Sequence, residues 1–363
     1  MTTPRIIPQE RTPRIELVAI AENDIAHVAR FIAAQSGRVA ENIESHLRWF
    51  LLENPARRPQ DPLGYALRSA GELAGCILCS PQAFRFANER IVLMGSSSFY
   101  VDHRYRGHGG RIFLQYCRLA NQQPLFGTSA NAQAAALWKA AGASPIPYSD
   151  GELFGVLRWP PVIEELAHRW HPSRVISHLA GSPISHFAGL VRPLNIDGGA
   201  SDALQPLTSV EQVSDLPIHD SPAKLTAMRD LPYIRWRYFS GRDRTVAVFA
   251  FRSRQPDCEI LVTVNQRTRG YRGQINSLNV LDVYPEVSPQ EWTRIVGALI
   301  ARYRKIVDAV VLRSQDSDRH KVFCKRGFQW RTFDAPNGWF LDKGKPLPTH
   351  DWYPVPADGD GLI

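Results

Sequence analysis

The chain has 363 residues, a formal net charge of +8 and 44% hydrophobic residues, which suggests two domains with sizeable cores. No apolar run approaches the roughly 20 residues that a membrane span needs, and residues 1–13 lack the apolar stretch of a signal peptide. The five cysteines are an odd number and argue against a disulfide framework, so we expect a cytoplasmic protein that does not bind membranes.

The positive charge comes chiefly from arginine, and it is dispersed over both halves of the chain. No dense basic run and no DNA-binding motif accompanies it, which argues against a nucleic-acid partner. Cys76 and Cys79 form one CxxC pair inside an apolar strand, where residues three apart point to opposite faces. Two further ligands at zinc-site spacing are missing, so we expect no metal.

The first elements predict an α/β (α+β) fold. Residues 14–20 alternate like a strand, and Asp24 can cap a helix over residues 25–32. A second helix covers residues 40–53 and stops before Pro55. Strands near residues 64–69 and 73–79 then join through Ala70-Gly71, a hairpin turn.

The most informative segment is residues 101–110, Val-Asp-His-Arg-Tyr-Arg-Gly-His-Gly-Gly, between an apolar strand (residues 91–101) and a helix from residue 112. Glycines allow backbone N–H groups to converge on a phosphate, and a helix N-terminus adds partial positive charge. The Walker A pattern is absent, and the dinucleotide fingerprint fails because position 112 is Ile. The pattern predicts either a phosphate cradle or an ordinary strand-to-helix turn with solvated arginines.

Arg104-x-x-Gly107-x-Gly109 resembles the pyrophosphate loop of the GCN5-related N-acetyltransferases, the GNAT superfamily. A second landmark supports the resemblance: a short strand over residues 124–129, Asn131, an amphipathic helix and a closing Gly142. In that family the Asn contacts the pantetheine arm, and a Tyr in the helix often protonates the departing thiolate. Here Trp138 stands at the Tyr position, and an indole N–H is not a usable acid.

The resemblance implies a site for acetyl-CoA or another acyl-CoA, formed by a set of residues in the loop and the following helix: Val101, Arg104, Arg106, Gly107, His108, Gly109, Gly110, Asn131 and Trp138. It also implies that backbone N–H groups near Tyr100 and Val101 stabilise the oxyanion of the thioester. The strand before the loop carries no acid, so we take Tyr100 first and His103 second as the groups that move protons. The helix that flanks acceptor sites in this family contributes three further candidates for proton transfer, Glu41, Glu44 and His46. It also contributes the candidate substrate contacts Arg48 and Trp49. Glu44 can instead pair with Arg48 on a solvated face, and Trp49 can serve packing.

The second half repeats this order. Arg235-Trp236 corresponds to Arg48-Trp49, and strands over residues 245–252, 259–265 and 275–283 precede a helix over 289–303. A strand over residues 308–313 and a helix over 317–326 follow, and Gly327 lies eleven positions after Asp316, as Gly142 does after Asn131. We therefore predict tandem GNAT-like domains, each a mixed, mostly antiparallel sheet flanked by helices. The connection at residues 284–289 has no glycine pair and no arginine, so this copy is expected to be degenerate and to complete the acceptor cleft or fix an interface.

The expected domains are an N-terminal extension (1–13), a GNAT domain with the acyl-CoA site (14–150), a transitional segment (151–215), a degenerate GNAT-like domain (216–345) and a tail (346–363). The expected activity is direct transfer of an acyl group, most simply acetyl, from acyl-CoA to a primary amine of a small molecule. The alternatives are a catalytically weak acyl-CoA sensor or scaffold, and an aminoacyl-transferase-like tandem GNAT protein. Acceptor, acyl length and oligomeric state stay open.

Overall fold

The computed structural model describes residues 14–170, 194–196, 201–213, 225–240, 245–253, 259–270, 273–313, 316–344, 347 and 352–353. The expected N-terminal extension, most of the transitional segment and most of the tail lie outside these residues. Within the described ranges, none of the helices is long and apolar enough to cross a bilayer.

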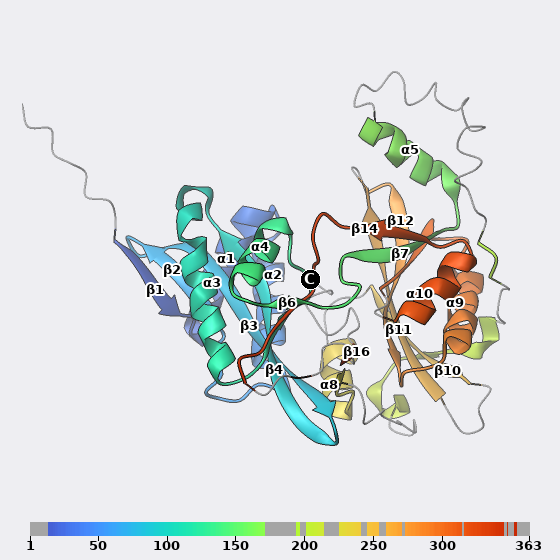
Figure 1. Ribbon diagram of the computed structural model, residues 1–363, viewed down its shortest axis with the longest axis horizontal. Helices are drawn as coiled ribbons and strands as arrows, with labels where there is room; N and C mark the ends of the chain where they lie inside the picture. Colours follow the sequence, from blue (N-terminus) through green and yellow to red (C-terminus); the bar gives the residue numbers. More distant parts are fainter. Residues whose placement is uncertain are drawn as a thin grey trace, which may run out of the picture.

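Two mixed sheets, mostly antiparallel, form the framework (Figure 1). The first has the order β1 (Ile15–Ala19), β2 (Gly64–Ser69), β3 (Glu72–Phe86), β4 (Glu89–Val101), β5 (Leu125–Gly127), β15 (Trp339–Leu341) and β6 (Ser144–Pro145). Beside this path, β9 (Leu225–Ala227) pairs with β3, and β16 (Trp352–Tyr353) pairs with β9. The second has the order β14 (Gln329–Thr332), β7 (Gly151–Val156), β13 (Ala309–Leu312), β12 (Ile275–Tyr284), β11 (Glu259–Arg269), β10 (Val246–Arg252) and β8 (Leu204–Leu207).

The helices cover these sheets in layers. The first sheet carries α1 (Ile25–Ser36) and α2 (Ala40–Leu47) on one face, and α3 (Gly109–Cys117) and α4 (Ala132–Ala140) on the other. The second sheet carries α9 (Pro289–Tyr303) and α10 (Ser317–Lys325) on its outer face (Figure 1). The remaining described α-helices are α5 (Trp159–Trp170) and the short α8 (Leu231–Ile234). This arrangement confirms the predicted fold class.

The two sheets exchange strands. The segment that leaves the first sheet after β6 becomes β7 and inserts between β13 and β14, where Leu153 pairs with Leu312 and Trp330. In return, β15 inserts between β5 and β6, and Phe340 pairs with Phe126. Figure 1 shows the green β7 among the orange strands of the second sheet. The expected boundaries at residues 150 and 216 therefore do not separate the sheets: β7 and β8 from the expected linker belong to the second sheet, and β15 belongs to the first.

A shared core lies between the sheets. It combines residues of α1 and α2 with Cys76 and Leu78 of the first sheet and with Leu261 and Leu281 of the second. At its centre, Trp49 and Trp236 stack with their ring centroids 5.2 Å apart. The indole Nε1 of Trp49 donates to the carbonyl of Trp236 at 2.9 Å, and Nε1 of Trp236 donates to the carbonyl of Trp49 at 3.0 Å.

The Arg-Trp recurrence thus marks equivalent positions that meet across this core. Both tryptophans lie in short π-helical segments, η2 (Arg48–Leu52) and η7 (Arg235–Phe239). The second half of the helix expected over residues 40–53 is therefore η2 rather than α-helix. The reciprocal bonds satisfy two buried donors and two buried acceptors at once, which fixes one half of the chain against the other.

Candidate functional site

The connection from β4 to α3 is held from within by Asp102. This residue caps the short helix η3 (His103–His108), and its carboxylate accepts from the backbone N–H of Arg104 at 2.9 Å. The Arg104 guanidinium also donates to Asp102, with Nη2 2.9 Å from Oδ2. These hydrogen bonds from Arg104 lower the pKa of Asp102 to about 2. Nδ1 of His103 lies 3.3 Å from the same carboxylate.

The glycines of the loop leave open space in front of the backbone. A Cβ atom placed on Gly107 or Gly110 would meet no heavy atom within 4 Å, and one on Gly109 would meet only Val101 and Phe99 at ordinary contact distance. Gly109 and Gly110 are the first residues of α3, where N–H groups have no partner within the helix. The N–H of Gly109 donates to the carbonyl of Arg106, so the N–H of Gly110 and the helix dipole are the features that favour an anion in this space.

Beyond this loop the first sheet opens between β4 and β5. The two strands pair in parallel only where Met94 and Gly95 face Leu125 and Phe126. Below the opening, the buried hydroxyl of Tyr116 donates to the Met94 carbonyl at 2.7 Å. Burial raises the pKa of Tyr116 well above its usual value, so this donor stays protonated.

A bulge shapes the open edge of β4. Ser98 and Phe99 together stand opposite the single residue Ile77 of β3, and Ser98 has a φ of 48°. The left-handed conformation is strained for a serine, and such bulges occur beside active sites, where they redirect the backbone. Because β5 diverges here, the β4 edge from Ser96 to Val101 lines a pocket instead of pairing with a strand.

The helix after β5 completes the wall of the pocket. Asn131 caps α4 by accepting from the backbone N–H of Ala134 at 2.9 Å, and Gly142 ends it with a φ of 82°. In the second half, Asp316 caps α10 and Gly327 follows it with a φ of 97°. The equal spacing in the sequence therefore marks equivalent helices. Trp138 of α4 is buried and meets Phe113 edge-on, with ring centroids 5.2 Å apart.

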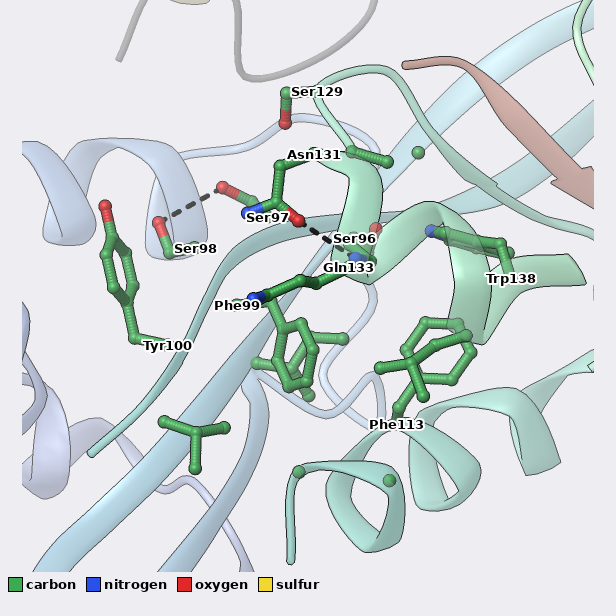
Figure 2. Close-up of a pocket in the computed structure, with 18 of the residues that line it drawn as sticks. Ser96, Ser97, Ser98, Phe99, Tyr100, Phe113, Ser129, Asn131, Gln133 and Trp138 are labelled. Atoms are coloured by element: carbon green, nitrogen blue, oxygen red, sulfur yellow. Dashed lines mark hydrogen bonds between the residues drawn. The ribbon is translucent and has the colours of Figure 1, made fainter. Parts of the chain in front are cut away.

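The resulting pocket has a volume of about 660 Å³ (Figure 2). It runs from the N-terminus of α3 along β4 to the end of β5. The predicted residues that line it are Tyr100, Val101, Arg106, Gly109, Gly110, Asn131 and Trp138. Sequence reasoning missed Gln133 and the serines Ser96, Ser97, Ser98 and Ser129, which supply much of its polar surface.

The other predicted residues lie elsewhere. Arg104 is hydrogen-bonded to Asp102, and His103 is largely exposed beside it. Gly107 and His108 lie in η3 and do not line the pocket. Arg48 pairs with Glu44 at 2.9 Å on the surface, as the self-paired interpretation expected. Trp49 lies in the shared core, where it contacts Trp236.

A second pocket of about 250 Å³ opens from the first. Ser98, Tyr100 and Ser129 line both pockets, so Tyr100 stands at their junction. The opposite wall belongs to the second sheet, and the charged residues that line this pocket are all arginines: Arg38, Arg267, Arg269 and Arg313. None was predicted as a site residue. The signal was present in Asn265-x-Arg267-x-Arg269, because residues two apart in a strand share a face.

The corresponding connection in the second half is closed. Ser288 caps α9 by accepting from the backbone N–H of Glu291 at 3.2 Å, and Pro289 supplies no N–H at the first helical position. Glu286 lies 3.8 Å from the buried Arg319. A carboxylate and a side-chain cap thus stand where the first half has open glycines.

The buried cysteines do not form a reactive or metal-binding site among the described residues. Cys76 packs in the shared core and Cys79 under α3 and α4, on opposite faces of β3. Burial raises the pKa of Cys76 to about 12 and that of Cys79 still further, so neither thiol is poised to ionise. Among the described residues, no three His, Cys, Asp or Glu side chains gather closely enough to hold a metal ion.

Comparisons with known proteins identify the fold. No protein-family model matches the sequence, and no curated protein matches it either. Among solved structures, the chain is similar to a GCN5-related N-acetyltransferase from Anabaena variabilis, with 12% identity and a TM-score of 0.55 over 90% of this chain and 72% of that one. It is also similar to N-myristoyltransferase of Saccharomyces cerevisiae with bound myristoyl-CoA, with 10% identity and a TM-score of 0.55 over 97% and 85% of the two chains. A probable N-acyltransferase from Enterococcus faecalis matches at 10% identity and a TM-score of 0.53, over 90% and 72%. The chain therefore has the GNAT fold.

Proposed function

We propose that this protein is an N-acyltransferase that moves an acyl group from acyl-CoA to a primary amine, with the donor bound in the 660 Å³ pocket of the first half. The observation that carries the proposal is the continuity of that pocket. It joins an open helix N-terminus, which suits a pyrophosphate, to the bulged edge of β4, where the strands diverge. A purely structural turn would need no opening behind it.

In this proposal, three regions of the pocket bind three parts of the acyl-CoA donor. The N–H group of Gly110, the N-terminal dipole of α3 and the guanidinium of Arg106 hold the pyrophosphate. The open edge of β4 and the amide of Asn131 flank the pantetheine arm. Backbone donors at the Ser98–Phe99 bulge lie where the thioester carbonyl gains negative charge, and such donors stabilise an oxyanion.

Tyr100 takes the proton-transfer role because it borders both pockets. The amine nitrogen forms a bond to the acyl carbon, the carbon–sulfur bond breaks, and Tyr100 donates its hydroxyl proton to the leaving thiolate. A phenol hydroxyl can donate a proton in this way. The proton that the nitrogen loses then restores the Tyr100 hydroxyl through solvent. The charged residues that line the two pockets are arginines, and their repulsion favours the uncharged form of an incoming amine.

Neither pocket is lined by a carboxylate that could take a proton from the amine. This feature favours one competing function, a sensor that binds acyl-CoA without turnover. Calorimetry with acetyl-CoA and longer acyl-CoAs, followed by a thiol-release assay over an amine panel, tests both. We expect micromolar binding, release of CoA that depends on the amine, and a loss of kcat in Tyr100→Phe with little change in donor affinity. The matched control is Tyr148→Phe, which changes an exposed tyrosine that lines neither pocket.

Binding without turnover on any amine would favour the sensor. An absence of binding to every acyl-CoA would overturn both functions. Unaltered turnover in Tyr100→Phe would remove Tyr100 from the mechanism and leave the donor site standing.

A further inference from the structure

The second pocket has the composition of an anion-binding site. Arg267 and Arg269 extend from β11 and Arg313 follows β13, whereas Arg38 comes from the turn after α1 in the first half. Guanidinium groups that converge on one small pocket suit a carboxylate or a phosphate, which they bind through paired N–H donors. The pocket is therefore assembled from both halves of the chain around a concentrated positive charge.

A hydrogen-bond chain holds part of this wall rigid. Glu152 of β7 is buried, and its Oε1 accepts from Nη1 of Arg269 at 2.6 Å. Nη2 of Arg269 donates to Oδ1 of Asn279 at 2.6 Å, and Nδ2 of Asn279 donates to Oδ1 of Asn265 at 3.0 Å. Because Arg269 donates to the oxygen of Asn279 and Asn279 donates to the oxygen of Asn265, the chain orients Asn265 with its amide nitrogen as the free end.

That free end is an unusual feature of the pocket wall. Asn265 is fully buried and lines the pocket, yet its Nδ2 has no hydrogen-bond partner among the described residues. A buried amide N–H without a partner is costly, and native structures seldom keep one without a reason. A ligand oxygen in the pocket would supply the missing acceptor.

We propose that this pocket binds the anionic group of the acceptor, so that the substrate is a small amine that carries a carboxylate or a phosphate. Arg267, Arg313 and Arg38 bind the anion, Asn265 donates to one of its oxygens, and Arg269 acts as a positioning residue between Glu152 and Asn279. The inference rests on the proposed acyl transfer, because it places the acceptor amine beside Tyr100, where the two pockets meet. The reaction adds no reactant: the amine gains the acyl group and CoA leaves as a thiol.

The arginines of this pocket are separate from the cation expected to hold the donor phosphates. Arg106 and the α3 N-terminus line the first pocket only, whereas the four arginines line the second only. The shared residues, Ser98, Tyr100 and Ser129, lie between the two groups of cations. An acceptor anchored at the second group would therefore present its amine toward the bulge of β4.

The turnover test uses matched pairs of amines with acetyl-CoA: glycine against glycinamide, β-alanine against its amide, and glucosamine 6-phosphate against glucosamine. We expect kcat/KM to be at least tenfold higher for the anionic member of the best pair. Arg267→Gln and Arg313→Gln should each lower that value roughly 10- to 100-fold, because each removes a charged hydrogen-bond donor. The kcat/KM for the neutral amine of the pair and the Kd for acetyl-CoA should not change in these variants.

The matched control is Arg304→Gln, at the exposed end of α9, which should change none of these values. Equal rates for anionic and neutral amines, or equal losses for both in the variants, would overturn the inference and leave acyl transfer intact. A preference for succinyl-CoA over acetyl-CoA that disappears in Arg267→Gln would also overturn it, because the anion would then belong to the donor.

A binding measurement keeps the inference testable without turnover. Inorganic phosphate should shift the side-chain amide resonances of Asn265 in the wild-type protein and should do so much less in Arg267→Gln and Arg313→Gln. No shift at millimolar phosphate would overturn the anion site. If phosphate shifts these resonances while no acyl-CoA binds, the proposed function fails and the anion site remains.

Discussion

Gly110 offers a test that separates binding from folding. A methyl group added there meets no heavy atom within 4 Å, and the residue has helical backbone in the first turn of α3. Alanine loses less conformational freedom on folding than glycine does in a helix, by roughly 0.5–1 kcal/mol. Gly110→Ala should therefore raise the free energy of unfolding by up to about that amount.

The same methyl group should weaken acyl-CoA binding. Cβ atoms on a helix point toward its N-terminus, and Gly110 lines the donor pocket, so the methyl group enters the space assigned to the pyrophosphate. Loss of one N–H hydrogen bond to a charged group costs about 1.5–3 kcal/mol. The Kd for acetyl-CoA should rise roughly 10- to 100-fold.

Urea unfolding and calorimetry measure the two effects on the same preparations. Gly142→Ala is the matched control, because a Cβ there also meets no heavy atom within 4 Å but the φ of +82° disfavours any side chain. That variant should lose about 1 kcal/mol of stability and keep its Kd. If Gly110→Ala binds acetyl-CoA as tightly as the wild-type protein, the loop is an ordinary turn and the donor assignment is wrong.

Three other outcomes test separate parts of the structure. Arg106→Gln should raise the Kd for acetyl-CoA roughly tenfold, whereas Arg104→Gln should change it less because Asp102 already binds that guanidinium; the reverse ranking by calorimetry would refute the division of roles. Trp49→Phe and Trp236→Phe should each lower the free energy of unfolding by about 1–3 kcal/mol, because each removes one buried indole hydrogen bond across the core and part of the ring that packs there. Strict additivity in the double variant would contradict their direct coupling. Because the Asp102 pKa is lowered to about 2, its stabilising contact with Arg104 should be complete above the pKa of ~3.9 of an unfolded aspartate and should be lost as the pH falls toward 2; an NMR titration midpoint near ~4 would refute this.

Local rules predicted the elements that build the donor site. Ala70 and Gly71 both have positive φ values, 51° and 87°, as a tight hairpin between β2 and β3 requires. Asn131 and Gly142 cap α4 at the positions that the sequence indicated. These features depend on residues within a few positions of one another, so the sequence alone specifies them.

The parts that the sequence did not reveal depend on distant contacts. The strand exchange brings Phe340 beside Phe126, and no local pattern records such a pairing. The length of β11 was also underestimated. The expected strand ended at residue 265 and left out Arg267 and Arg269, whereas the observed strand runs to Arg269. Extending the alternation by four residues would have placed three polar side chains on one face.

The second half has no glycine loop, and its sheet contributes to the two pockets in a different way from the first sheet. The proposed acyl-CoA site uses exposed backbone, which the first half offers through the β4 bulge and the divergence of β5. The proposed acceptor site uses side chains of β11 and β12, and Glu152 of the exchanged strand β7 holds one of them, Arg269. The pairing of Trp49 with Trp236 fixes these two surfaces against each other. Because Ser288 caps α9 and Glu286 stands beside Arg319 where a second glycine loop would lie, the proposal assigns the donor phosphates to the first half alone.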